Sequence, residues 1–413
     1  MDKYTIRKLL KIPYLKVTEI ISIDDKEIHI KLEPYKRRLA VCSGCGKKHR
    51  SFHSYNETIV QDRMIVDLRV YLHIVKRRYR CSEDKSIRTE EMLWLKKWSR
   101  VTKRFAKQVN RLTAITTNKE AGWYLGLDDE TVYSIDKEML EEQYNAKLIP
   151  PPAALNISVD EVSYKKYHRY LTNVVDTDVR AIIWNDKGRK TEILDRYYVG
   201  IGEDACKRIE SVALDGARTF ISSTNKYAVN ATIVYDKFHI MQKLNWAVDM
   251  ARKQELRKAR KENNNELVNL INCKQRFILL KNKNNLTENQ AGYLKRLCEI
   301  NEPIYKAMLL KESFIKVYDY EAPEEAQSYL ENWIKDAAES TVETFKIIAS
   351  SFKDKLQYII NWFRKKISSA ISEGINNKIK RLKRMAYGYR DVDYFRLKIH
   401  QHCGLLNPRR YAT

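Results

Sequence analysis

The sequence has 413 residues, and its 77 Lys and Arg residues outnumber its 53 Asp and Glu residues, giving a formal net charge of +24. Solubility requires a charge of magnitude roughly 2–8 in a small domain, so this excess indicates a polyanionic partner, DNA or RNA. A hydrophobic content of 44% excludes a disordered basic tail, and the lack of an apolar run of about 20 residues or of a signal-peptide core predicts a cytoplasmic, nucleoid-associated protein with no membrane segment.

Three cysteines predict a zinc-binding N-terminal domain over residues 1–98. Cys42 and Cys45 form a Cys-x-x-Cys knuckle, and Cys81 follows a strand-like run. Such a knuckle delivers two thiolates to one tetrahedral ion, and a second pair normally closes the site. Here the second pair begins at Cys81, and its last position holds an aspartate. The candidates for the fourth zinc ligand are Asp84, His49 and His53. The alternative is a remnant knuckle that has lost its metal.

Residues 99–148 have a helical pattern that predicts a helix-turn-helix DNA-binding domain. Ala121 lies where two helices must approach closely, Gly126 can make the turn, and Asp128 or Asp129 can cap the second helix. The alternative is an ordinary helical hairpin, and the prolines at 150–152 end the domain in either case. The residues that the second helix would present to the major groove are Thr131, Tyr133, Ser134 and Lys137.

After the prolines, residues 153–240 have the periodicity of strands. Three consecutive strands, then two more that each follow a helix-length segment, have the order of a ribonuclease-H-like sheet. In that fold the first and fourth strands are neighbours, about 4.8 Å apart. Asp160 lies near the end of the first strand and Asp215 at the end of the fourth. We therefore expect them to share two cations, Mg²⁺ or Mn²⁺, about 3.5–4 Å apart, as in-line phosphoryl transfer requires.

Asp236 is the rival for the second catalytic position. It ends the fifth strand, one strand farther out and so about 10 Å from the first, which favours Asp215. Asp236 and His239 are better interpreted as an auxiliary pair that positions the strand-to-helix turn or a scissile phosphate. Glu161 would alternate to the opposite face of its strand, so we assign it no chemistry.

The rest of the chain predicts an all-helical insertion over residues 241–355 and the last part of the core over residues 356–413. Trp246, Trp333 and Trp362 are expected in the apolar core. Glu373 opens a segment that is otherwise basic and rich in amides, and the helix before it would bring Glu373 to the two aspartates. The residues expected to hold phosphates or contact sugar and base edges are Asn376, Asn377, Lys378, Lys380, Arg381, Lys383 and Arg384. The alternative is a solvated basic helix.

Together the knuckle, the helix-turn-helix and the motifs SVDEVSY, VALDGA, YDKFHIMQKLNWAVDMARKQ and SEGINNKIKRLKRMAYGYR resemble the bacterial insertion-sequence transposases of the ISL-three family, over nearly the whole chain. The resemblance implies a DDE transposase, a multidomain α+β protein whose front end binds terminal inverted repeats. It places the catalytic triad on Asp160, Asp215 and Glu373, in agreement with the strand order. The chain departs from the family at Asp84, where cysteine is usual.

The resemblance also implies the order of the reaction. Asp160 would bridge two Mg²⁺ ions, with Asp215 and Glu373 each holding one. The site would cut a strand at the end of the element and then use the freed 3′-hydroxyl to attack target DNA. Two DNA ends imply at least a dimer. The competing hypotheses are a DNA-binding regulator with a catalytically inactive core and a metal-dependent ribonuclease.

Overall fold

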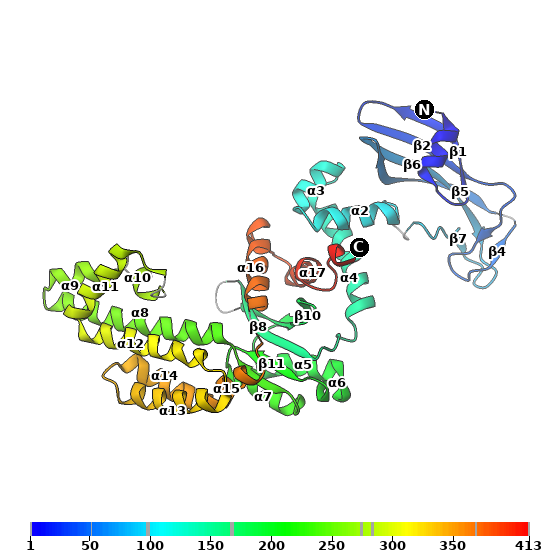
Figure 1. Cartoon of the computed structure of the whole chain (residues 1–413). Coiled ribbons are helices and arrows are strands. Elements are labelled where there is room, and N and C mark those ends of the chain that lie inside the picture. Colours follow the sequence, from blue (N-terminus) through cyan, green and yellow to red (C-terminus); the bar gives the residue numbers. More distant parts are fainter. Residues whose placement is uncertain are drawn as a thin grey trace. The chain divides into compact units, whose positions relative to one another are not determined.

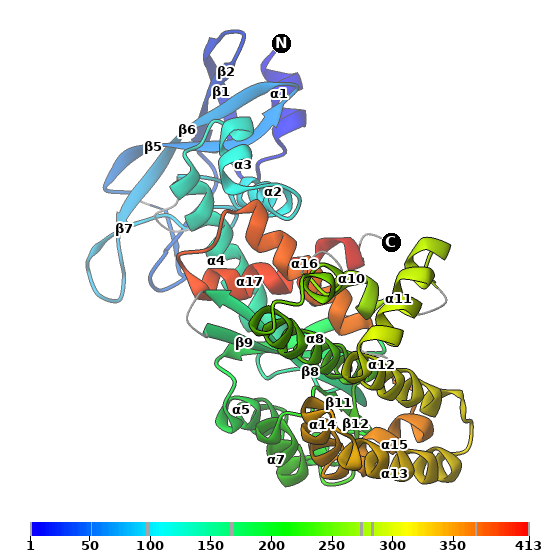
Figure 2. The same ribbon diagram turned by 90° about the vertical axis from the view of Figure 1, so that its left-hand side faces the viewer.

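The computed structural model describes residues 2–50, 52–95, 100–165, 169–272, 276–281, 285–367 and 370–411 (Figures 1 and 2). The chain forms two compact units, one of residues 1–147, 389–402 and 406–413 and the other of residues 148–388 and 403–405. Most of the last α-helix, α17 (Val392–Cys403), thus groups with the N-terminal residues, although its residues were predicted to belong to the last part of the core. Within the described ranges, no helix is long and apolar enough to cross a membrane.

The first unit contains a sheet with the strand order β1-β2-β6-β5, and β7 pairs with β6. Val70, Leu72 and Ile74 alternate along β6 with less buried residues and pack in one core with Ile6 and Leu10 of α1. A small ladder of β3 and β4 precedes β5 and carries the cysteine knuckle. The elements are α1 (Lys3–Leu10), β1 (Leu15–Ile23), β2 (Glu27–Pro34), β3 (Ala40–Val41), β4 (Lys48–His49), β5 (Ser54–Ile65), β6 (Leu68–Arg80) and β7 (Ile87–Thr89).

Three helices follow in the same unit: α2 (Lys103–Thr113), α3 (Asn118–Leu125) and α4 (Asp129–Leu148). Gly126 ends α3 with a left-handed backbone (φ 68°), a conformation that costs glycine little. Asp128 accepts a hydrogen bond from the Thr131 backbone N–H at 2.7 Å, as a helix cap does. The predicted turn at Gly126 and the cap at Asp128 are therefore confirmed.

A buried ionic network ties α17 to α4 within the first unit. Asp136 is 0% exposed and Lys398 is 3% exposed, and the lysine Nζ lies 3.1 Å from the Asp136 carboxylate. Tyr394 donates a second hydrogen bond to Asp136, at 2.7 Å. Partners removed from water in this way must satisfy one another, because an unpaired buried charge is strongly destabilising.

The second unit is built on a five-stranded sheet with the order β10-β9-β8-β11-β12. The first three strands form an antiparallel meander, and β11 is parallel to both of its neighbours, β8 and β12. The predicted adjacency of the first and fourth strands is confirmed. The strands are β8 (Asn156–Lys165), β9 (Arg169–Asp176), β10 (Ala181–Lys187), β11 (Ser211–Leu214) and β12 (Thr232–Tyr235).

Helices lie on both faces of this sheet. Ile157 and Val159 of β8 pack in one core with residues of α5 (Thr191–Ile201) and α7 (Arg218–Tyr227), and the short α6 (Glu203–Lys207) lies between those helices in sequence. Because successive side chains of a strand alternate, Ser158 and Asp160 point to the other face. There Ser158 is hydrogen-bonded to Ser372 of α16 (Ala370–Met385), with 2.8 Å between the hydroxyl oxygens.

Between β12 and α16 the described residues form helices, the longest of which is α8 (Lys237–Lys261). Helices α8, α12, α13 and α14 lie together (Figure 1). Their shared core contains Phe314, Trp333, Phe345 and Phe352. Trp333 is 3% exposed as expected, but Trp246 is 49% exposed, so its predicted burial is wrong. The other helices are α9 (Asn265–Leu270), α10 (Arg276–Leu280), α11 (Glu288–Ile300), α12 (Glu302–Ile315), α13 (Pro323–Glu339), α14 (Glu343–Lys353) and α15 (Leu356–Arg364).

Candidate active site

Three aspartates align across neighbouring parallel strands of the second unit. Ala213 of β11 pairs with Ser158 of β8; two residues farther along the chain are Asp160, within β8, and Asp215, directly after β11. In the same register, Asp236 directly follows the residue of β12 that pairs with the last residue of β11. Neighbouring strands lie about 4.8 Å apart, so Asp160 and Asp215 are adjacent, whereas Asp236 is one strand farther from Asp160.

Asp160 is largely enclosed, with a side chain 13% exposed. It accepts a hydrogen bond from the Asn376 amide at 2.5 Å, and the His239 Nε2 lies 3.9 Å from its other oxygen. Burial raises the pKa of Asp160, and the charge of Asp215 adds to the rise, while His239 and Asn376 oppose it. Two carboxylates that repel each other in a partly dry site form a group that a divalent cation would stabilise.

The other two aspartates hold the turns that follow their strands. Asp215 accepts a hydrogen bond from the Ala217 N–H at 2.8 Å. Asp236 caps the N-terminus of α8 by accepting from the Phe238 N–H at 2.9 Å. His239 lies one turn into α8, with its Nε2 3.5 Å from Asp236, and so stands between Asp236 and Asp160.

Glu373 lies in the first turn of α16 and is partly exposed. The helix runs along β8, since Ser372 contacts Ser158 and Asn376 contacts Asp160. Within the described part of the chain, the Glu373 carboxylate forms no hydrogen bond or ion pair. The carboxylate oxygens of Asp160, Asp215 and Glu373 do not all lie within 4.8 Å of one another among the described residues. Asn376 was predicted to contact DNA, and this stays a prediction; in the structure its amide is bonded to Asp160. Its spacing of three from Glu373 places both on one helix face.

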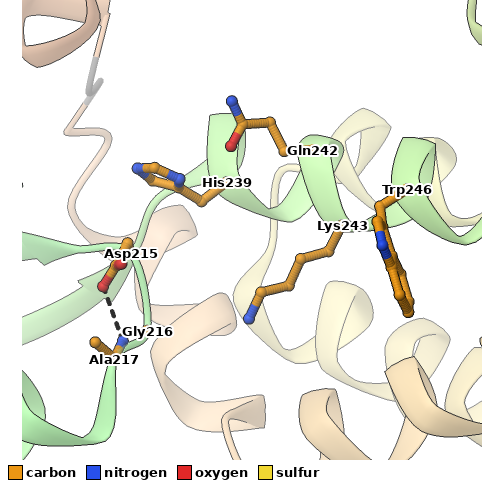
Figure 3. Close-up of a pocket in the computed structure, with 7 residues that line it drawn as sticks. All are labelled: Asp215, Gly216, Ala217, His239, Gln242, Lys243 and Trp246. Carbon is orange, nitrogen blue, oxygen red and sulfur yellow. Dashed lines mark hydrogen bonds between the residues drawn. The ribbon is translucent and has the colours of Figure 1, made fainter. Parts of the chain in front are cut away.

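A pocket of about 350 Å³ opens beside Asp215 (Figure 3). Gly216 and Ala217 form one wall, and residues of α8 form the other. The residues of α8 that line it follow one another along the helix, with His239 nearest to Asp215 and Trp246 farthest away: His239, Gln242, Lys243 and Trp246.

A second groove, of about 700 Å³, lies between β8 and the second half of α16. Val162 and Ser163 of β8 line it, so it begins two residues beyond Asp160. Tyr387 at its rim is fully exposed and has a left-handed backbone (φ 50°). The predicted DNA-binding residues Lys380, Lys383 and Arg384 line this groove, whereas Asn377, Lys378 and Arg381 are exposed on α16.

The residues predicted to enter the major groove from α4 are largely engaged within the first unit. The Lys137 Nζ lies 2.7 Å from the Asp391 carboxylate, which also accepts a hydrogen bond from the Tyr133 hydroxyl at 2.7 Å. Burial works against ionisation of Asp391, but these two partners hold its pKa below its usual range. The Thr131 hydroxyl donates to Asp128 as part of the helix cap. Ser134 alone of the four is exposed.

The three cysteines of the first unit form a candidate metal centre. The sulfur atoms of Cys42, Cys45 and Cys81 all lie within 4.8 Å of one another. Burial alone would raise the pKa of Cys42, but the backbone N–H groups of Cys45 and Gly44, both 3.4 Å from its sulfur, lower that pKa to about 7. Thiolates are the form that binds zinc, so this geometry suits the metal.

Among the described residues, the cluster of three cysteines does not include any of the candidates for the fourth zinc ligand, which are Asp84, His49 and His53. The Asp84 carboxylate accepts hydrogen bonds from the Ser86 hydroxyl at 2.6 Å and from Arg88 at 2.5 Å. The His49 ring stacks on Tyr79 with the ring centroids 4.7 Å apart, and His53 contacts the neighbouring serine hydroxyl. Asp84 is therefore committed to Arg88 and Ser86 in this arrangement, and its role as a zinc ligand stays a prediction.

Comparison with known proteins gives two family matches and two kinds of relative. Residues 157–399 match the family of ISL-three DDE proteins described as "Transposase", and residues 38–84 match the "zinc-finger of transposase IS204/IS1001/IS1096/IS1165". The chain is 30% identical over 376 residues to the transposase for insertion sequence element IS1001 of Bordetella parapertussis, covering 91% of each protein. It is 28% identical over 257 residues to the transposase for insertion sequence element IS1557 in two strains of Mycobacterium tuberculosis, covering 57% of this chain and 56% of that protein.

Proposed function

The chain belongs to the ISL-three family of DDE transposases, and we propose that it cuts DNA at the terminal inverted repeats of an insertion sequence and joins the cut end to target DNA with Asp160, Asp215 and Glu373 as the catalytic residues. The observation that carries this assignment is the register that sets Asp160 beside Asp215 on neighbouring parallel strands, with the helix of Glu373 lying along the same strand. The sheet order, a meander followed by two parallel strands, supports a ribonuclease-H-like core.

The residues around Asp160 suit a divalent cation, and we propose Mg²⁺. Oxygen ligands are the ones that Mg²⁺ prefers, and two ions bound here would activate the attacking hydroxyl and stabilise the leaving oxygen. Asn376 orients the Asp160 carboxylate through its 2.5 Å hydrogen bond, and Asp236 fixes the start of α8, from which His239 reaches towards Asp160. Lys380, Lys383 and Arg384 then neutralise phosphates of the DNA strand that follows the groove beside α16.

The first unit is proposed to recognise the ends of the element. The match to a transposase zinc finger supports a zinc ion on Cys42, Cys45 and Cys81, and the turn at Gly126 supports a helix-turn-helix formed by α3 and α4. Because an element has two ends, the active form is proposed to be at least a dimer, working on the nucleoid. A regulator with an inactive core is not favoured, because the similarity to a named transposase spans 91% of the chain.

Nicking of a supercoiled plasmid that carries the terminal repeats tests this proposal. Wild type should cut the plasmid only with Mg²⁺, and Asp160→Asn should bind the repeats but not cut. To decide between the two rival aspartates, we would compare Asp215→Asn with Asp236→Asn, because asparagine can still accept the hydrogen bonds that hold each turn. Loss of cutting in Asp236→Asn alone would reverse the assignment of the second carboxylate, and cutting by Asp160→Asn would refute the site as a whole.

A further inference from the structure

Two lysines whose pKa values respond to the charge of Asp215 form no ion pair with a carboxylate in the described part of the chain. The Nζ of Lys243 and the Nζ of Lys355 lie 5.1 Å and 5.9 Å from the ring centroid of Tyr235. Lys355 donates to the Ser351 hydroxyl at 3.2 Å. Burial lowers the pKa of both lysines, and the charge of Lys355 lowers that of Lys243 further, while the charge of Asp215 opposes both shifts. Two half-buried cations on one tyrosine ring, with no carboxylate in ion-pair contact, favour an anion bound beside them.

Near the two lysines, a buried hydroxyl group has no hydrogen-bond partner in the described part of the chain. Tyr235 is 1% exposed, and its hydroxyl has no hydrogen-bond partner among the described residues. The hydroxyl end of its ring lies against Gly216, which lines the pocket beside Asp215. The N-terminus of α7 begins at the same wall; its N-cap residue, Ala217, donates its backbone N–H to Asp215 and provides no side-chain cap. Buried donors are rarely left unpaired in proteins, and helix N-termini attract anions, so these groups favour the same kind of ligand as the lysines.

The side chains of α8 extend this anion site into a track. His239, Gln242, Lys243 and Trp246 have the spacing of a single helix face and line one pocket (Figure 3). From His239 to Trp246 the helix rises about 10 Å, which matches the axial rise of about three nucleotides of one strand of B-form DNA. Trp246 is 49% exposed at the far end, an unusual position for the largest apolar side chain. Cations alternating with an aromatic face are the combination that binds a phosphodiester backbone and stacks on its bases.

We propose that this track is a second DNA path, in which Lys243 and Lys355 hold a backbone phosphate and Trp246 stacks on a base, on the side of the catalytic aspartates opposite the groove of α16. The inference rests on the proposed function. One groove begins beyond Asp160 and the other begins at Asp215, so a strand whose scissile phosphate lies at the aspartates continues into both. Two kinds of DNA present a phosphate at the aspartates: the DNA that flanks the element before cutting, and the target DNA before joining. Either of them could occupy the track.

Binding measurements without added Mg²⁺ separate this role from catalysis. One probe is a duplex that ends at the cleavage position, the second is the same duplex extended by flanking DNA, and the third is an unrelated duplex offered as target to protein already bound to the first. Because the two lysines hold one phosphate between them, replacing both Lys243 and Lys355 with Ala should lower the slope of log affinity against log salt by about 0.9 for the probe that uses the track. Trp246→Ala should weaken binding of that probe by about 5- to 150-fold.

Matched variants guard against a merely structural effect. Lys258→Ala removes an exposed lysine from the same helix and should change nothing, whereas Lys243→Arg and Trp246→Phe should retain most of the affinity. A loss limited to the flanked probe identifies flanking DNA, a loss limited to the third probe identifies target DNA, and a loss with both means that one path serves both in turn. If wild type cuts plasmid but the variants show unchanged affinity and salt slope with every probe, the track is overturned and the proposed function stands. If wild type never cuts plasmid, the proposed function is refuted.

Discussion

Gly216 should be the glycine of the catalytic unit that tolerates alanine least, because two penalties add at this position. Its φ is +78°, in the left-handed region, where a residue with a β-carbon loses about 1–2 kcal/mol. A β-carbon there would also stand 2.7 Å from Cζ and 2.9 Å from Cε2 of Tyr235, closer than real contacts allow. Tyr235 is buried at the end of β12 and has little room to move, so the overlap should cost about 1–3 kcal/mol more. We therefore expect Gly216→Ala to lower the free energy of unfolding by about 2–5 kcal/mol.

Urea unfolding of the full chain, followed by circular dichroism, measures this loss. Gly388→Ala is the matched control, since Gly388 also has a positive φ (+101°) but has nothing within 4 Å of the added carbon. The control should cost only about 1–2 kcal/mol, and the difference between the two variants reports the overlap with Tyr235. Replacing Tyr235 with Leu in the Gly216→Ala background should recover part of the difference, so the two changes together should cost less than their sum. Equal losses in Gly216→Ala and Gly388→Ala would refute the argument that the Tyr235 ring is pressed against the turn after Asp215.

Three further expectations concern the metal centre, the buried ion pair and the basic helix. Cys45→Ser should reduce bound zinc from about one equivalent to none and unfold the surrounding residues, as metal analysis and proteolysis can check; well-folded wild type without zinc would contradict this. Asp136→Asn should destabilise the first unit by about 3–5 kcal/mol in urea, because Lys398 is left buried without its counter-charge, and a loss below about 1 kcal/mol would be incompatible with that network. Replacing Lys383 and Arg384 with Ala should lower the salt slope of DNA binding by up to about 2, and an unchanged slope would mean that α16 faces only solvent.

Local patterns in the sequence were sufficient for features that depend on neighbouring residues or on strand order. The left-handed turn at Gly126, the cap at Asp128, and the adjacency of the strands that carry Asp160 and Asp215 all follow from residue types and their order along the chain. The knuckle is similar: Cys42 and Cys45 are three apart, and backbone N–H groups within the same turn bind the Cys42 sulfur. The turn, the cap and the knuckle need no knowledge of distant contacts, because the forces that produce them act within a few residues. The adjacency of β8 and β11 is a distant contact, and the order of strands and helices along the chain was enough to predict it.

What the tertiary structure decided is which side chains are engaged by residues far away in the sequence. Lys137 and Tyr133 have the spacing of a recognition helix, but Asp391, more than 250 residues later, binds both of them. Asn376 belongs by composition to a basic, amide-rich segment, yet α16 runs along β8 and turns it to Asp160. Trp246 is an apolar residue typical of a core, but the packing of the other helices leaves half of its surface open, at the far end of the pocket that begins at Asp215. A charged group or an aromatic ring can bind a ligand only if no other part of the protein already contacts it. Such contacts come from long-range packing, which periodicity and spacing in the sequence do not encode.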